Sequence, residues 1–141
     1  MLPARTHPEK INREHKEKFH RGLEQFNAEC FFEAHEIWEE VWLASPEPDK
    51  TFLQGLIQIA AAFHHYRRGN LPGTRSLLKA ALRRLAPFPA THGGIALEPV
   101  RFAAGQWAAA LDADGDPGAA RLPKIRQAHR RKVESEIDRK T

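Results

Sequence analysis

The chain has 141 residues, of which 41% are hydrophobic and 28% charged, a length and composition typical of one globular domain. No run of about 18 apolar residues is present, so we expect no transmembrane helix. Residues 1–10 lack the apolar segment of a secretory signal. The single cysteine, Cys30, excludes an intramolecular disulfide and a multi-cysteine zinc site. We therefore expect a cytoplasmic protein.

The formal net charge of +4 is unevenly distributed. Residues 121–141 contain eight of the 22 Lys and Arg residues but only three of the 18 Asp and Glu residues. The rest of the chain is therefore close to neutral. The high isoelectric point of the whole chain comes from the tail and does not indicate a nucleic-acid-binding domain. Contact with nucleic acid is expected only through the basic tail, residues 121–141, and a solubilising role for that tail is an equal alternative.

Apolar residues at helical spacing predict three helices in the first half of the chain. The first, residues 9–27, has a narrow apolar stripe ending in Leu23 and Phe26. The second, residues 31–44, ends before two prolines. The third, residues 52–68, is apolar nearly all round, which is typical of a central helix packed on several sides.

Two further helices are predicted, over residues 72–85 and 98–112, and we expect the second of them to bury Phe102, Trp107 and Leu111. The expected fold is an all-α, compact bundle of about five helices over residues 1–112. Residues 113–141 are expected to be a linker and basic tail, in which residues 123–140 form a sixth, C-terminal helix or remain disordered until they meet a partner.

Two motifs in the second and third helices resemble domain-of-unknown-function family 309, a family of small all-helical proteins in bacteria and plastids. The first is a Glu-x-His-Glu-x-x-Glu run with a nearby Trp, here Glu33, His35, Glu36, Glu39 and Trp42. The second is a Leu-Gln-Gly motif followed by small residues, a His and a Gly, here Leu53, Gln54, Gly55, Ala60, Ala61, His64 and Gly69. The resemblance covers residues 19–86. It implies a compact helical bundle and no assigned activity.

The candidate site residues are the polar side chains in positions otherwise suited to a core: His35, Glu39, Gln54, Gln58 and His64. The i, i+4 spacing sets His35 and Glu39 on one side of a helix. An antiparallel neighbour would bring His64 to the same level. Glu36 is expected to point away from His35.

These residues leave two functions open. One is a non-enzymatic bundle that binds a protein partner or assembles with itself as a homodimer, with His35, Glu39 and His64 as a buried polar strut. The alternative is a metal- or small-ligand-binding protein, with hydrolase-type chemistry as one form of it, in which those three residues hold a divalent metal and Gln54 or Gln58 contacts a ligand. We favour the first and a non-enzymatic role, because buried histidines are more often structural than catalytic.

Overall fold

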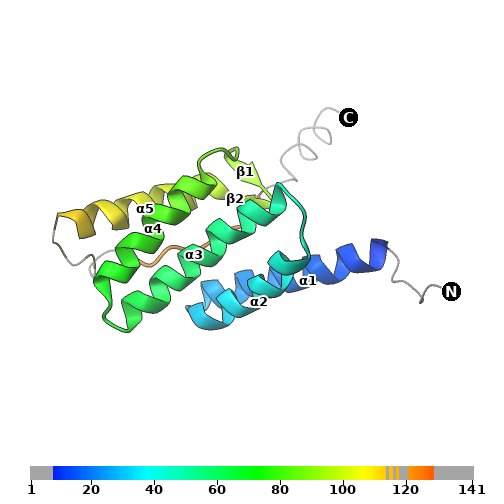
Figure 1. Ribbon diagram of the computed structural model, residues 1–141, viewed down its shortest axis with the longest axis horizontal. Coiled ribbons are helices and arrows are strands. Elements are labelled where there is room, and N and C mark those ends of the chain that lie inside the picture. The colour runs from blue at the N-terminus through cyan, green and yellow to red at the C-terminus, as the bar shows by residue number, and fades with distance from the viewer. Residues whose placement is uncertain (1–7, 114, 116, 118–120, 129–141) are drawn as a thin grey trace, which may run out of the picture.

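The computed structural model describes residues 8–113, 115, 117 and 121–128, with the side chains of residues 8–12 left out. Helices dominate it, which confirms the all-α prediction (Figure 1). The elements, in order, are α1 (Pro8–Asn27), α2 (Phe31–Ala44), α3 (Asp49–Arg67), α4 (Leu71–Leu85), β1 (Thr91–His92), β2 (Ile95–Ala96) and α5 (Leu97–Asp112). The helices pack in chain order, so that α3 lies between α2 and α4, while α1 covers α2 and α5 covers α4.

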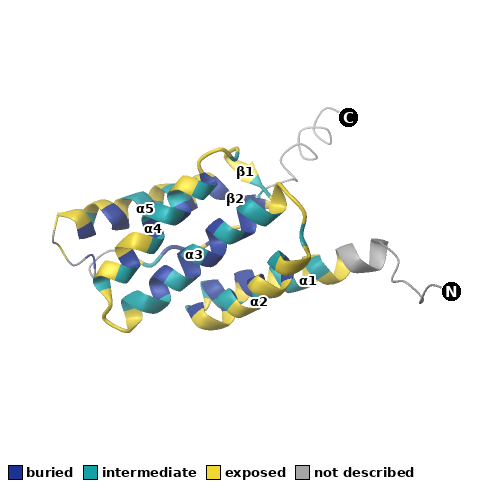
Figure 2. Cartoon of the chain, in the orientation of Figure 1, coloured by how far each residue is buried: buried dark blue, intermediate teal, exposed yellow. Residues whose placement is uncertain are grey.

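The central helix, α3, carries the largest share of the core. Nine of its 19 residues are buried, and Figure 2 shows the buried positions following its length. Gly55 explains how closely α4 approaches, because a Cβ atom there would lie 2.5 Å from a carbon of Leu85. The helix propensity lost at a central glycine, about 1 kcal/mol, is therefore offset by packing that no other residue permits.

Helix α2 is fixed to α1 by an indole ring. Trp38 is fully buried, stacks on Phe19 and Phe26, and donates a hydrogen bond from Nε1 to the Phe19 carbonyl oxygen at 3.1 Å. The bond satisfies the one polar atom of a ring that otherwise packs among apolar side chains. The α1–α2 pair thus has one defined register.

Helix α3 begins three residues earlier than predicted. Pro48 is its N-cap residue, and the Glu47 carboxylate accepts hydrogen bonds from both the backbone N–H and the hydroxyl of Thr51. Those bonds lower the pKa of Glu47. They also satisfy an N–H that has no partner inside the helix, so the helix extends to Asp49.

The prediction for Phe102 is wrong. Its side chain is 66% exposed, because the buried stripe of α5 runs through Val100, Ala104, Trp107 and Leu111 and leaves position 102 on the opposite side. Trp107 and Leu111 are buried as predicted.

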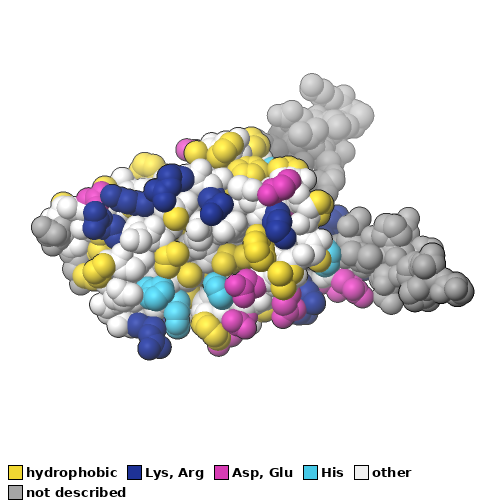
Figure 3. All heavy atoms as spheres, in the orientation of Figure 1, with side chains coloured by type: hydrophobic (Ala, Val, Ile, Leu, Met, Phe, Trp, Pro, Cys, Tyr) yellow, Lys and Arg dark blue, Asp and Glu magenta, His cyan; other side chains and the backbone are white. Residues whose placement is uncertain are grey.

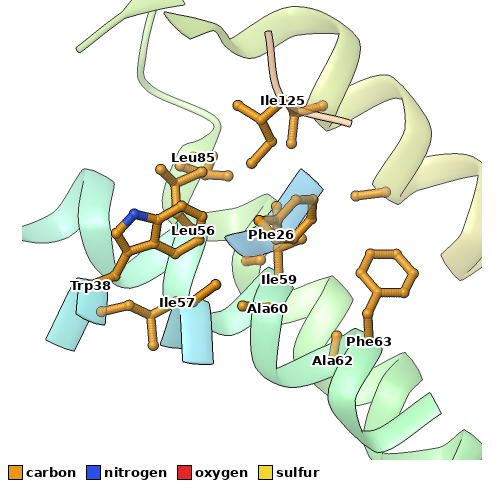
Figure 4. Packing of buried hydrophobic residues seen from close by; sticks show 14 of the residues in the cluster. Phe26, Trp38, Leu56, Ile57, Ile59, Ala60, Ala62, Phe63, Leu85 and Ile125 are labelled. Atoms are coloured by element: carbon orange, nitrogen blue, oxygen red, sulfur yellow. The ribbon is translucent and has the colours of Figure 1, made fainter. Parts of the chain in front are cut away.

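Residues 121–128 form an extended strap across the bundle instead of a helix. Asn27 holds the strap with two hydrogen bonds: its side-chain nitrogen donates to the Ile125 carbonyl oxygen at 2.9 Å, and its side-chain oxygen accepts from the Ile125 N–H at 2.8 Å. Gln127 pairs antiparallel with Ile95 in β2. Ile125 is 2% exposed and points into the cluster that contains Phe26 and Leu85 (Figure 4).

This segment therefore packs on the helices, unlike the solvated tail expected from its composition. The remainder of the predicted tail and sixth helix, residues 129–141, lies outside the described residues. Among the described helices, none combines the length and the apolar character needed to cross a bilayer.

Candidate functional site

A His/Glu cluster lies on α2, and it consists of His35, Glu36 and Glu39, without the predicted His64. Nε2 of His35 lies 3.7 Å from a carboxylate oxygen of Glu39, and Nδ1 lies 3.8 Å from a carboxylate oxygen of Glu36. The expectation that Glu36 points away from His35 is wrong, because the long Glu36 side chain folds back beside the ring. One ligand atom from each of the three residues falls within 4.8 Å of the others.

His64 lies near this cluster without joining it. The ring of Phe32 packs against both histidines, with centroids 6.2 Å from His35 and 5.4 Å from His64. Burial, followed by the positive charges of Arg68, His65 and His35, lowers the pKa of His64 below its ordinary value of 6.5. His64 is therefore neutral at pH 7.

The cluster is also more open than expected. The Glu39 side chain is 50% exposed and that of Glu36 is 55% exposed, whereas His35 is 23% exposed. Carboxylates of this exposure remain hydrated, so the cluster is a half-open surface feature and not a buried strut.

The polar strip of α3 is half-buried along its whole length. Gln54, Gln58 and His65 recur at helical spacing on the side of α3 that the neighbouring helices do not cover. His65 Nδ1 lies 3.1 Å from the amide nitrogen of Asn70, the residue that caps α4 by accepting a hydrogen bond from the Gly73 N–H. The strip therefore runs from the start of α3 to the α3–α4 turn.

We call this strip, together with the accessible residues of α2 and α4 that flank it, the α2–α3–α4 face. Its members are Phe32, His35, Glu36, Glu39, Trp42 and Leu43 from α2, then Thr51, Gln54, Gln58, Ala61, His64 and His65 from α3, and Leu77, Ala80, Arg83 and Arg84 from α4.

The α2–α3–α4 face gathers polar atoms that have no partner. Among the described residues, five side-chain nitrogen or oxygen atoms are buried without a hydrogen bond, and four of them belong to this face: His35 Nδ1, Trp42 Nε1, Gln58 Oε1 and Arg84 Nε. Folded proteins leave few such atoms unsatisfied, because each costs about 1–3 kcal/mol. Their concentration on one surface marks it as the candidate site.

The charges on this face are separated. Glu36 and Glu39 lie on α2, and Arg83 and Arg84 lie on α4, with α3 between them. Figure 3 shows acidic side chains gathered over α2, Lys and Arg over α4, and histidines in the middle. Arg84 and Thr51 line a common depression at the α4 edge.

Sequence patterns did not assign Glu36, Trp42 or Arg84 to the site, although Glu36 and Trp42 belong to the family motif. The helical spacing puts Trp42 with the buried side chains of α2, and the structure places it at the edge of that face, only partly buried. Arg84 is brought to the face only by the packing of α4 on α3, which no local pattern reveals.

Comparison with known proteins finds the family that the sequence resembles. The model of the family described as "Domain of unknown function (DUF309)" matches residues 19–77. The predicted resemblance is confirmed. The DUF309 segment contains the second half of α1, all of α2 and α3, and the first half of α4, so it includes the acidic side of the α2–α3–α4 face and its α3 strip.

Two bacterial proteins are similar over part of this chain. An "Uncharacterized protein" of Aquifex aeolicus (strain VF5) is 39% identical over 77 residues, which cover 54% of this chain and 23% of that protein. The "Uncharacterized protein YpuF" of Bacillus subtilis (strain 168) is 41% identical over 56 residues, which cover 39% of this chain and 32% of that protein. The aligned regions thus span less than a third of either relative.

Proposed function

We propose that this protein is a non-enzymatic, self-assembling bundle that docks on a second copy of itself through the α2–α3–α4 face, in the cytoplasm. The observation that carries the proposal is the gathering of four unpaired buried polar atoms on this face. All four side chains are only partly buried, although the four atoms are shielded from solvent, so each side chain would have to rotate to offer its atom to a partner. A docked surface would supply the hydrogen bonds that the isolated chain lacks.

Charge separation favours a second copy as the occupant. A two-fold axis that lies in the plane of the face and is inclined to α3 sets the acidic edge of each copy against the basic edge of the other, whereas an axis perpendicular to the helices would set α2 against α2. With the inclined axis, Glu36 and Glu39 meet Arg83 and Arg84 twice, because a two-fold interface repeats every contact. Complementary charges of this kind set orientation and suppress wrong partners.

The α2–α3–α4 face also has the exposed apolar side chains that a stable interface needs. Phe32 is 49% exposed and Leu43 is 72% exposed, both on α2 and both among the most exposed large hydrophobic side chains of the described chain. Half-buried Ala61 on α3 and Leu77 on α4 add further apolar area. The face thus combines apolar and charged side chains, as protein interfaces do.

Exchange of charges between the two edges tests the proposal. The double variant Glu36→Lys/Glu39→Lys and the double variant Arg83→Glu/Arg84→Glu should each be monomeric, because each sets like charges opposite one another. An equimolar mixture should regain the dimer, because both contacts of a mixed pair are then attractive. Sedimentation velocity of the two variants and of their mixture measures this directly.

The matched control variant makes the same change in net charge at two positions outside the α2–α3–α4 face. Glu24 is exposed on α1, and Glu40 forms an ion pair with Lys18 on the α1 side of α2. The variant Glu24→Lys/Glu40→Lys should therefore dimerise like the parent chain. A mixture of the two face variants that remains monomeric would overturn the proposed pairing of α2 with α4.

The distances around His35 favour a second candidate function, the binding of a divalent metal by His35, Glu36 and Glu39. Their ligand atoms already lie within 4.8 Å of one another, and small side-chain rotations bring them to a common ion at about 2.0–2.2 Å. Imidazole with carboxylates suits zinc or manganese. Metal content of tag-free protein tests this candidate: near-stoichiometric metal that is lost in His35→Ala supports it, and metal-free protein eliminates it.

A further inference from the structure

A cavity of about 270 Å³ opens on the other side of the bundle, between α1, the turn after α2, the start of α3 and the β1–β2 turn. Its floor is apolar and includes Phe19, Phe52 and Leu53. Phe52 and Leu53 are 3% and 4% exposed, so the floor is part of the packed core. The volume is slightly below the roughly 300–1,000 Å³ of pockets for drug-sized ligands, which suits a smaller molecule.

The wall formed by Gly93 is shaped by its lack of a side chain. Gly93 has φ +61°, and a Cβ atom there would lie 2.7 Å from the Phe52 ring. Its backbone therefore packs flat on that ring. The ring also packs against Phe88 and His92, whose centroids lie 5.6 Å and 4.6 Å away. The aromatic wall of the cavity is thus fixed in place by its neighbours.

The rim of the cavity carries two opposite charges that do not neutralise each other. Lys16 projects from α1 and Asp49 stands in the first turn of α3, and both line the cavity. No ion pair joins them, and Lys16 has no ion pair with any residue whose side chain the structure describes. The only such contact of Asp49 among those residues is to Nε2 of His92, at 3.5 Å.

An apolar floor with a separate cation and anion at its rim matches one class of ligand. We propose that this cavity binds a small zwitterion with an apolar body, such as an apolar α-amino acid. The carboxylate pairs with Lys16, the ammonium pairs with Asp49, and the side chain rests on Phe19, Phe52 and Leu53. Charge-assisted hydrogen bonds at both ends would select this class over molecules with one charge. The inference is independent of the α2–α3–α4 face.

Three related probes separate the contributions of the charges. L-phenylalanine carries both charges, 3-phenylpropionate only the carboxylate, and 2-phenylethylamine only the ammonium. In a titration of ¹⁵N-labelled full-length protein, the chemical shifts of two N–H groups report on the cavity. One is the Gly93 amide in the cavity wall, and the other is the indole N–H of Trp38, which donates a hydrogen bond to the carbonyl oxygen of Phe19, a floor residue. We expect L-phenylalanine to bind with a Kd of about 1 mM and each single-charge probe to bind at least about fivefold more weakly.

Variants assign the charges to residues. Lys16→Met and Asp49→Asn should each weaken L-phenylalanine about fivefold or more. Lys18→Met is the matched control, because Lys18 lies two residues away on α1 and pairs with Glu40 outside the cavity. Asp49→Asn should leave binding of 3-phenylpropionate unchanged, which distinguishes a lost contact from a collapsed pocket.

Three outcomes would overturn the proposal. The first is the absence of shifts at Gly93 and Trp38 with all three probes up to 20-fold above the expected Kd of about 1 mM. The second is equal binding of L-phenylalanine and 3-phenylpropionate, which would remove the role of Asp49. The third is equal loss of affinity in Lys16→Met and Lys18→Met.

Discussion

A Cβ atom at Gly22 of α1 would lie 2.1 Å from Nε1 of Trp38 on α2. The indole is fully buried, and its N–H bonds to the Phe19 carbonyl oxygen one turn before the glycine. The absence of a side chain at position 22 is therefore what lets α2 approach α1 closely enough for this bond.

We expect Gly22→Ala to lower the free energy of unfolding by about 1–3 kcal/mol. An alanine in a helix interior normally adds up to about 1 kcal/mol of stability, but overpacking against a fixed ring outweighs that gain. Gly105→Ala is the control, because among the described residues no atom beyond its own turn of α5 lies within 4 Å of a Cβ atom at that position, and it should stabilise the protein by about 0.5–1 kcal/mol. Urea denaturation measures both, and equal stabilisation by the two variants would refute the close approach.

The second prediction concerns the clamp between Asn27 and the strap. Asn27→Ala removes two hydrogen bonds to Ile125 and should lower the free energy of unfolding by about 1–3 kcal/mol. Asn27→Asp keeps the acceptor for the Ile125 N–H but loses the donor, so it should cost less. Hydrogen exchange at the Ile125 amide should accelerate in Asn27→Ala more than in Asn27→Asp. Unchanged exchange in both variants would show that the Asn27 side chain does not hold the strap.

The third prediction is a pH dependence at Asp112. Hydrogen bonds from Lys79 and Arg75, at 3.0 and 2.6 Å, hold the pKa of the Asp112 carboxyl below its usual value of 3.8. Because the pKa of Asp112 is lower in the folded state than in the unfolded state, its ionised carboxylate stabilises the fold. This stabilisation is at its full value above the pKa of the unfolded state, and it is lost as the pH falls through the pKa of the folded state.

The melting temperature of Asp112→Asn should therefore lie below that of the parent chain at pH 7, and the difference should shrink as pH falls below about 3.8. Because Asp112 is solvent-exposed, the difference at pH 7 should be small and should diminish in high salt. A difference that is constant between pH 7 and pH 3 would exclude the charge as its cause.

The helices could be predicted because each has a complete local signal. Helix α2 combines a periodic stripe with a proline-containing stop, and both of its ends fall where predicted. The start of α3 was missed because Pro46 and Pro48 suggest a longer break. The Glu47–Thr51 contact that extends the helix is a detail of side-chain geometry.

The strap could not be recognised by helical periodicity. Its signal has period two, with Pro123 and Ile125 buried and Lys124 and Arg126 exposed. Four residues are too few to decide between a strand and a charged tail. One of the partners that hold it, Asn27, lies about 100 positions earlier in the chain.

The candidate site was predictable only in part. The placement of His35 beside Glu39 follows from i, i+4 spacing, and both were correctly brought together. The openness of the cluster was not foreseen, because exposure depends on what covers α2 and not on α2 itself. The α2–α3–α4 face and the cavity at Lys16 and Asp49 each draw on several elements, so neither has a local sequence pattern.

The most direct test of the docking face is the solution mass of the full chain and of one variant at its centre. Ala61 lies half-buried in the middle of the α3 strip, so Ala61→Arg places a large cation there, and Ala109→Arg makes the same change at an exposed position of α5. We expect sedimentation equilibrium to give about twice the chain mass of 16.0 kDa for the parent chain and for Ala109→Arg. Ala61→Arg should have the mass of one chain, 16.0 kDa, and an unchanged helix content. A monomeric parent chain at about 100 μM, or identical masses for the two variants, would contradict self-assembly through this face.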